Sequence, residues 1–222
     1  MKRGLSAAFA IAAKDLRTEW RTRESLNASL SFALVILVLF SFAFDLDRDE
    51  RLAISGGLLW LAYIFAGALI VNRSFAREIP NDCLEVLIAA VPGWAIFLGK
   101  SMACFILLLI VELVSLPIFG LFYNIRWIAS FPSLLLVIAL ATWGITVVGS
   151  ALSAVTVNVR LRELMLPVLL YPLMIPLLIG AMEMTSGLLN GSAVISDIGL
   201  LIVYDVMFTS LALYLIEFIL VI

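Results

Sequence analysis

The chain has 222 residues, of which 64% are hydrophobic and only 14% charged, with a formal net charge of −2. Its mean hydropathy of +1.18 excludes a soluble globular domain and indicates an all-α integral membrane protein. The sequence contains no histidine, so the commonest metal ligand and the commonest general base are both missing.

Residues 1–24 carry charges throughout, which favours an amphipathic helix over a cleavable signal peptide. Apolar and basic side chains fall on different faces of this helix: Leu5, Phe9, Ala12, Leu16 and Trp20 on one, and Lys14, Arg17 and Arg21 on another. A tryptophan beside arginines is typical of the lipid headgroup layer. We interpret the helix as an orientation anchor at the membrane surface. The alternative is an elbow helix that also contacts a partner.

Six apolar segments follow, each long enough to cross a bilayer. They cover residues 25–44, 52–72, 96–123, 128–157, 164–182 and 198–222. The segments on the N-terminal side of the membrane hold eleven Lys and Arg residues, whereas the opposite loops hold only Arg48, Arg51 and Arg126. This bias predicts that both termini lie in the cytoplasm. Because no linker suggests a second domain, residues 1–222 are expected to form one transmembrane domain.

A polar interruption between the second and third spans predicts a short helix over residues 82–91. Pro80 blocks helix continuation, Asp82 is a suitable N-cap, and Glu85 follows three residues later, as in a capping box. Apolar residues then recur at helical spacing, at Leu84, Leu87, Ile88 and Val91. Such a helix is too short to span a bilayer and has the right size to dock on a partner.

Four carboxylates lie within or at the edges of spans: Glu112, Glu183, Asp205 and Glu217. An ionised carboxylate at mid-bilayer costs about 2.5–3.5 kcal/mol, so each should face the bundle interior, water or a subunit interface, or be protonated. Glu112 is the deepest and the best candidate for a structural or functional polar contact. For Glu183 and Glu217, a carboxylate at the membrane surface is at least as good an interpretation. A proton relay is a further possibility, but no lysine or arginine lies at matching depth.

The fifth span contains Pro167, Pro172 and Pro176, which predict a kinked helix. Small and polar residues after it predict a re-entrant or interfacial element; they are Gly180, Gly187, Asn190 and Gly191. The sequence has no G-x-x-x-x-G-K-[ST] motif, so we do not expect this chain to hydrolyse ATP by itself. No other catalytic motif occurs either, and we expect no catalytic, cofactor-binding or metal-binding residue.

The order of a charged entry helix, six spans and one short helix between spans two and three resembles the ABC-2 type permeases of ATP-driven exporters. Within that class, the sequence is similar to the haem exporter protein B family, the membrane subunit of the cytochrome c maturation transporter. The most specific matches are residues 72–76 (NRSFA) and residues 162–167 (RELMLP), which lead into the proline series. The other matching stretches are residues 14–24, 57–60, 84–85 with Leu87, 96–100, 111–114 with 116–117, and 171–176, whereas Cys83 and Val86 depart from the small residues that the family tends to have there.

The resemblance implies a location in the bacterial inner membrane and a set of partners. These are a cytoplasmic ABC ATPase, a second copy of the chain, a haem-handling membrane protein, a small single-span subunit and a periplasmic haem chaperone. It also implies that the partner subunit binds ATP and that haem is handled by the complex, with no cofactor bound directly by this chain. The absence of histidine agrees, since histidine is the usual axial ligand of haem. The ATPase would contact the short helix and its surroundings: Arg73, Arg77, Asp82, Leu84, Glu85 and Leu87.

The leading hypothesis is therefore a permease subunit that couples ATP hydrolysis by a separate subunit to rearrangement of the membrane domain. The outcome would be haem export or release of a haem-loaded chaperone. An ABC-2 permease for another cargo, such as a lipid or a drug, would share the architecture and differ in its partners. Two further alternatives are an intramembrane enzyme that uses Glu112 and Asp205, and a rigid scaffold.

Overall fold

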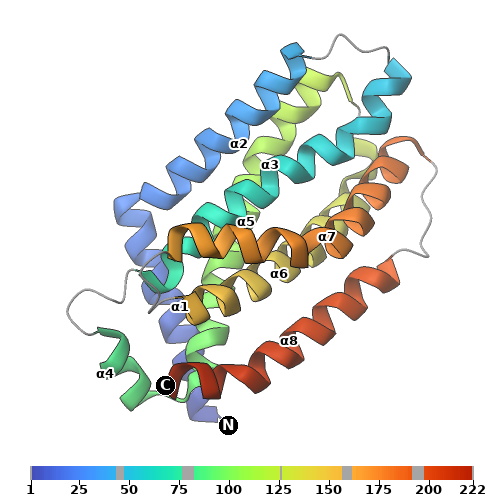
Figure 1. Cartoon of the computed structure of the whole chain (residues 1–222). Coiled ribbons are helices and arrows are strands. Elements are labelled where there is room, and N and C mark those ends of the chain that lie inside the picture. Colours follow the sequence, from blue (N-terminus) through green and yellow to red (C-terminus); the bar gives the residue numbers. More distant parts are fainter. Residues whose placement is uncertain are drawn as a thin grey trace.

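A computed structural model describes residues 2–43, 48–76, 83–125, 127–156, 162–191 and 198–221, which are helical and contain no strand. In chain order the elements are α1 (Lys2–Thr22), α2 (Glu24–Ala43), α3 (Arg48–Ala76), α4 (Cys83–Ala90), α5 (Gly93–Tyr123), the 3-10 turn η2 (Ile128–Ser130), α6 (Phe131–Thr156), α7 (Arg162–Leu189) and α8 (Ile198–Val221) (Figure 1). Six of these helices (α2, α3 and α5 to α8) are long and apolar enough to cross a membrane. The predicted all-α membrane fold with six spans is confirmed.

The fifth span differs from the sequence prediction in its length. Helix α7 continues to Leu189, and its three prolines lie inside it, whereas the sequence predicted an end at residue 182 and a separate element beyond. Two polar contacts hold the additional turns. The Trp60 indole N–H donates to the Thr185 hydroxyl at 2.9 Å, and the Ser130 hydroxyl donates to the Leu188 carbonyl at 3.0 Å. The chain turns only at Gly191, whose φ of 74° is left-handed.

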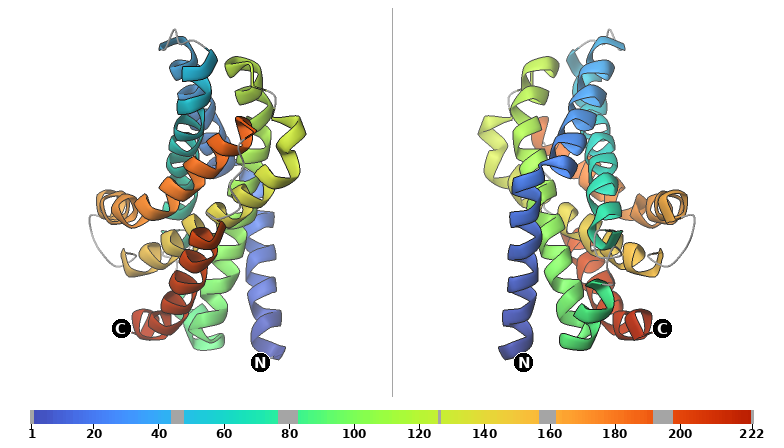
Figure 2. Two further views of the ribbon diagram at one scale, coloured as in Figure 1. Left: turned by 90° about the vertical axis from the view of Figure 1, so that its right-hand side faces the viewer. Right: turned by 90° about the vertical axis from the view of Figure 1, so that its left-hand side faces the viewer.

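Both termini lie at one end of the molecule together with α4 (Figures 1 and 2). At this end α1 lies beside the first part of α5, as both views in Figure 2 show. The contact is close because residue 99 is glycine: a Cβ atom there would lie 2.6 Å from the Ala8 carbonyl oxygen. The N-terminal helix is therefore packed backbone to backbone against the third span.

The buried apolar side chains form two clusters. The larger one contains Trp60, Tyr63 and Phe119 and joins the transmembrane helices α2, α3 and α5 to α8. The smaller one, which we call the end cluster, lies near the termini and consists of Ile11, Phe75, Ile96, Phe97, Val147, Ala154, Ala212 and Ile216. Helices α3 and α6 are the most buried spans, while α2 and α8 expose most of their apolar surface. Such exposed apolar surface is expected for helices that face lipid.

Candidate functional site

Helix α4 occupies the place of the predicted docking helix, over Cys83–Ala90 instead of residues 82–91. Leu87, Ile88 and Val91 are partly buried against the end cluster. Val86 is 69% exposed, so the opposite face of the helix carries an uncovered apolar side chain. Pro92 then directly precedes α5. The result is a short helix with one face attached to the membrane domain and the other turned outward.

Not all of the predicted coupling residues can be placed. Arg77 and Asp82 lie outside the described residues, as do the side chains of Leu84 and Glu85. The Arg73 guanidinium, near the end of α3, forms an ion pair with the Glu24 carboxylate at the start of α2. Both side chains are exposed, so this pair is a surface contact.

A second pair of charges is buried between α1, α3 and α5. The Lys100 side chain on α5 has no exposed surface, and its Nζ donates to the Asp15 carboxylate at 3.3 Å and to the Ser74 carbonyl at 2.9 Å. Nζ also lies 5.2 Å from the centre of the Phe75 ring, within the range of a cation–π contact. A buried lysine is tolerated where its charge is paired in this way.

The sequence predicts Lys100 as one of the basic residues on the N-terminal side, but it does not predict its partner. The spacing of residues in α1 nevertheless indicates which of its side chains turn inward. The buried face of α1 begins with Ala8, Ile11 and Ala12, and the same helical spacing continues to Asp15 and Glu19. Two acidic residues therefore lie on the face of α1 that packs inward.

Glu19 defines the junction between α1 and α2. It is fully buried, and its carboxylate accepts a hydrogen bond from the Leu26 N–H at 2.9 Å, which satisfies one of the free donors at the start of α2. Between the helices, Arg23 has a left-handed φ of 54°. The junction is thus fixed locally by Glu19 and tied to the neighbouring spans through Lys100–Asp15 and Arg73–Glu24.

Glu112 lies in the interior of the bundle and is completely buried. Its Oε2 accepts a hydrogen bond of 2.5 Å from the Thr142 hydroxyl on α6. The Tyr63 hydroxyl on α3 donates to the Glu112 backbone carbonyl at 3.1 Å. Among the described residues, nothing donates to Oε1 of Glu112. Glu112 therefore connects three spans through its side chain and its backbone.

The other three predicted carboxylates lie apart from it. Asp205 on α8 is 7% exposed and lies against Gly144 of α6, where a Cβ atom would be 2.8 Å from its Oδ1. Glu183 and Glu217 are exposed. Within the described parts of the chain, no hydrogen bond joins any two of the four, and no three Cys, Asp or Glu side chains are grouped to hold a metal ion.

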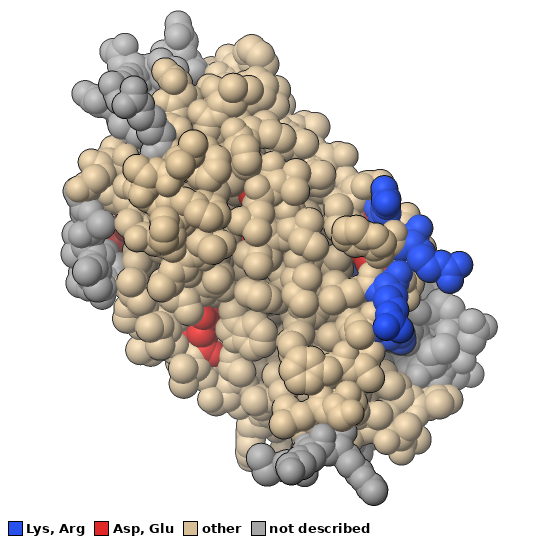
Figure 3. Space-filling view, turned by 180° about the vertical axis from the view of Figure 1, so that it is seen from behind, with Lys and Arg blue, Asp and Glu red and all other residues tan. Residues whose placement is uncertain are grey.

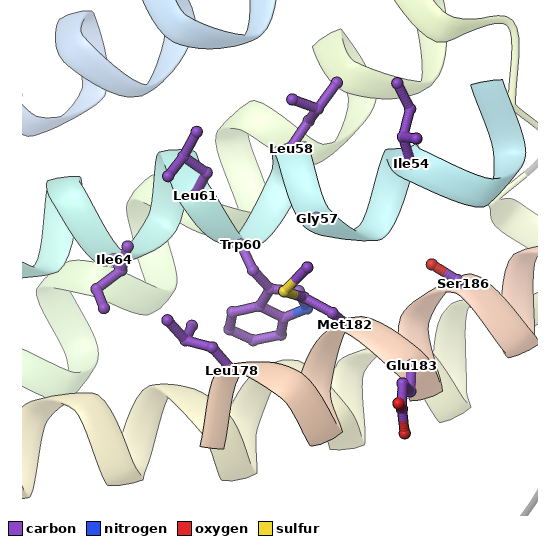
Figure 4. A pocket seen from close by; sticks show the side chains of 10 residues that line it. All are labelled: Ile54, Gly57, Leu58, Trp60, Leu61, Ile64, Leu178, Met182, Glu183 and Ser186. Atoms are coloured by element: carbon purple, nitrogen blue, oxygen red, sulfur yellow. The ribbon is translucent and has the colours of Figure 1, made fainter. Parts of the chain in front are cut away.

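A hollow of about 820 Å³ lies between α3 and α7. Figure 4 shows Trp60 pointing from α3 toward α7, with Leu178 and Met182 of α7 beside it and Glu183 directed away from α3. The volume is in the range of small-molecule sites, but the lining is almost entirely apolar. The sequence stretch 57–60 that carried part of the family resemblance lies in the wall of this hollow.

Comparison with known proteins gives one consistent result. The family model described as "CcmB protein" matches residues 6–218. Heme exporter protein B of Rhodobacter capsulatus is 26% identical over 186 residues, which cover 83% of this chain and 85% of the relative. Heme exporter protein B of Paracoccus denitrificans is 28% identical over 175 residues, which cover 78% of this chain and 80% of the relative. The chain thus belongs to the CcmB protein family.

Proposed function

We propose that this chain is the permease subunit of an ATP-driven ABC complex that handles haem during cytochrome c maturation in the bacterial inner membrane. Two facts support this proposal: the family match covers nearly the whole chain, and both relatives are named heme exporter protein B. The six apolar helices fit a membrane subunit of such a complex.

ATP hydrolysis is assigned to a separate cytoplasmic subunit. The closest approach to a phosphate-binding motif is Gly99-Lys100-Ser101, with the preceding glycine, Gly93, one residue too far away. This segment lies inside α5, and Lys100 is buried against Asp15 and the Ser74 carbonyl. A phosphate-binding loop needs a lysine and free backbone N–H groups that can reach phosphate, and neither is available in this helix.

The attachment of α4 is the structural observation that supports coupling through this chain. Its inner face packs on the end cluster, to which α1, α3, α5, α6 and α8 all contribute side chains. A displacement of α4 by an ATPase would therefore act on five helices through one apolar contact. The Lys100–Asp15 and Arg73–Glu24 pairs would keep α1 and α2 moving with α3 and α5.

Coupling would follow a shift between two packing arrangements. Nucleotide closes the ATPase pair, the α4 helices of two copies of this chain move, and the helix bundles rearrange at their other end. With no histidine in the sequence, haem ligation is assigned to other members of the complex. These are the haem-handling membrane protein, the small single-span subunit and the periplasmic chaperone. In this proposal, both termini lie in the cytoplasm.

The test is co-expression of the full chain with its ATPase, the haem-handling protein and the chaperone. Glu85→Lys and Val86→Glu should each lower ATPase co-purification at least ten-fold and abolish ATP-dependent release of the haem-loaded chaperone, while membrane insertion stays normal. The matched control is Ile128→Glu, because Ile128 is 74% exposed and lies in η2, after the far end of α5. Normal ATPase binding by both α4 variants would refute the proposed contact. Chaperone release that does not need this chain would refute the haem-related role.

A further inference from the structure

The charges of α1 are separated by sign. Asp15 and Glu19 point inward, whereas Lys14, Arg17 and Arg21 are exposed. The spacing of the basic residues, i, i+3 and i+7, places them on one face of the helix. Figure 3 shows exposed Lys and Arg side chains gathered at one edge of the molecule. Helix α1 therefore presents a ridge of positive charge.

Two adjoining hollows follow this ridge. The first has a volume of about 710 Å³ and is lined by Ala10, Ala13, Lys14, Arg17, Thr18, Arg21 and Thr22. The second has a volume of about 460 Å³ and is lined by Leu16, Arg17, Trp20 and Arg21. Arg17 and Arg21 belong to both. The first hollow carries the polar groups of Lys14, Thr18 and Thr22 beside apolar surface, while the second is almost entirely apolar, with Trp20 64% exposed beside it.

Arg17 and Arg21, which line both hollows, are available to bind an anionic ligand. Lys14 pairs with Asp15 at 3.1 Å, but no carboxylate in the described part of the chain pairs with Arg17 or Arg21. The hydroxyls of Thr18 and Thr22, each next to one of these arginines, donate to the carbonyls of Lys14 and Thr18 at 3.0 and 3.1 Å. The two guanidinium groups are thus the free donors of the ridge, and their planar geometry suits phosphate.

Two arginines beside an apolar hollow favour one class of ligand. A soluble anion would use the arginines and leave the apolar hollow empty, and an apolar peptide would leave the charges unmatched. A molecule with an anionic phosphate head and a hydrocarbon tail fills both hollows at once. Tryptophan is also typical of the boundary between headgroups and acyl chains.

We propose that α1 binds an anionic phospholipid, with the phosphate on Arg17 and Arg21 and an acyl chain along Leu16 and Trp20. This site lies on the outward face of α1 and does not include α4. It therefore stands independently of the role proposed above.

The test is native mass spectrometry of the purified full chain, titrated with phosphatidylglycerol or with phosphatidylcholine. The wild type should retain phosphatidylglycerol preferentially. Each arginine near an anionic lipid contributes about a five-fold effect, so Arg17→Gln/Arg21→Gln should reduce phosphatidylglycerol retention roughly 25-fold. Trp20→Ala should weaken retention of both lipids. Arg48→Gln/Arg51→Gln, in the first turn of α3 at the opposite end, is the matched control and should bind as the wild type does.

Any of four results would overturn the proposal. One is equal retention of both lipids by the wild type, and another is unchanged phosphatidylglycerol retention by Arg17→Gln/Arg21→Gln. The third is displacement of the lipid by millimolar inorganic phosphate, which would indicate a simple anion site. If the double variant retains lipid but loses co-purification with the ATPase, the ridge is a protein contact and the lipid assignment is wrong. Neither Arg17 nor Arg21 has an ion-pair partner among the described residues. Variants of these two arginines should therefore unfold at the same temperature as the wild type.

Discussion

The Thr142 hydroxyl on α6 donates a hydrogen bond of 2.5 Å to the Glu112 carboxylate on α5, and both residues are completely buried. In a bilayer there is no water to replace a lost partner, so a polar contact of this kind is specific for the helix pair that forms it. The bond explains how a glutamate is accommodated in the middle of a 31-residue apolar helix.

Replacing Thr142 by valine should destabilise the protein by about 1–2 kcal/mol, because Glu112 then loses its donor while the side-chain volume is kept. Chemical unfolding in detergent micelles measures this difference. Thr146→Val is the control, since the Thr146 hydroxyl donates only to carbonyls of its own helix, at 2.9 and 3.0 Å. Equal destabilisation by the two substitutions would contradict an interhelical role for Thr142.

Gly144→Ala should weaken the packing of α6 against α7 and α8. The new Cβ atom would lie 2.8 Å from Asp205 Oδ1 and 2.8 Å from Leu177 Cδ2, and crowding of this kind costs about 1–3 kcal/mol. Gly199→Ala on α8 is the matched control, because nothing lies within 4 Å of a Cβ atom there. We expect a lower thermal transition for Gly144→Ala and an unchanged or slightly higher one for Gly199→Ala. A lower transition temperature for Gly199→Ala than for Gly144→Ala would show that close packing of α8 on α6 at Gly144 does not limit stability.

The Lys100–Asp15 pair should show strong coupling in a double-mutant cycle. Asp15→Asn removes the negative charge beside a fully buried ammonium group. Lys100→Met leaves a carboxylate that is 19% exposed and partly solvated. We therefore expect Asp15→Asn to be the more damaging single change, toward the roughly 3–5 kcal/mol seen when a buried pair is broken.

The double variant Lys100→Met/Asp15→Leu should cost less than the sum of its two singles, because neither buried charge of the pair remains. The exposed Arg73–Glu24 pair provides the comparison: its removal by Gln substitutions should cost less than about 1 kcal/mol. Additive effects at Lys100 and Asp15, measured by reversible unfolding in the same detergent, would be inconsistent with a direct contact.

The number and order of the spans could be predicted from the sequence, because each apolar run is long and its ends are marked by charges or by proline and glycine. The end of α7 could not. Its glycines suggested an early stop, but the contacts of Thr185 with Trp60 and of Leu188 with Ser130 join residues that are 125 and 58 positions apart. Sequence patterns carry no direct information on such distant partners.

The same reason limited the prediction of the polar contacts. The cost of exposing a carboxylate to lipid indicated that Glu112 faces the bundle interior, water or a subunit interface, or is protonated, but Thr142 could not be identified as its donor. Lys100 and Asp15 are 85 positions apart, and only the periodicity of the inner face of α1 indicated that its acidic residues turn inward. Local patterns predicted the helices and their faces, while the pairing between helices required the fold.

The close packing of α1 on α5 at Gly99 also fixes an order of events during biosynthesis. Ala8 and Asp15 leave the ribosome before Gly99 and Lys100, and Asp15 precedes Lys100 by 85 residues. At roughly 5–20 residues per second, Asp15 is synthesised about 4–17 seconds before the Lys100 with which it pairs. During this interval α2 and α3 are synthesised, while the α5 surface that packs on α1 does not yet exist. Helix α1 therefore precedes the third span in synthesis but can reach its final position only after that span has been made.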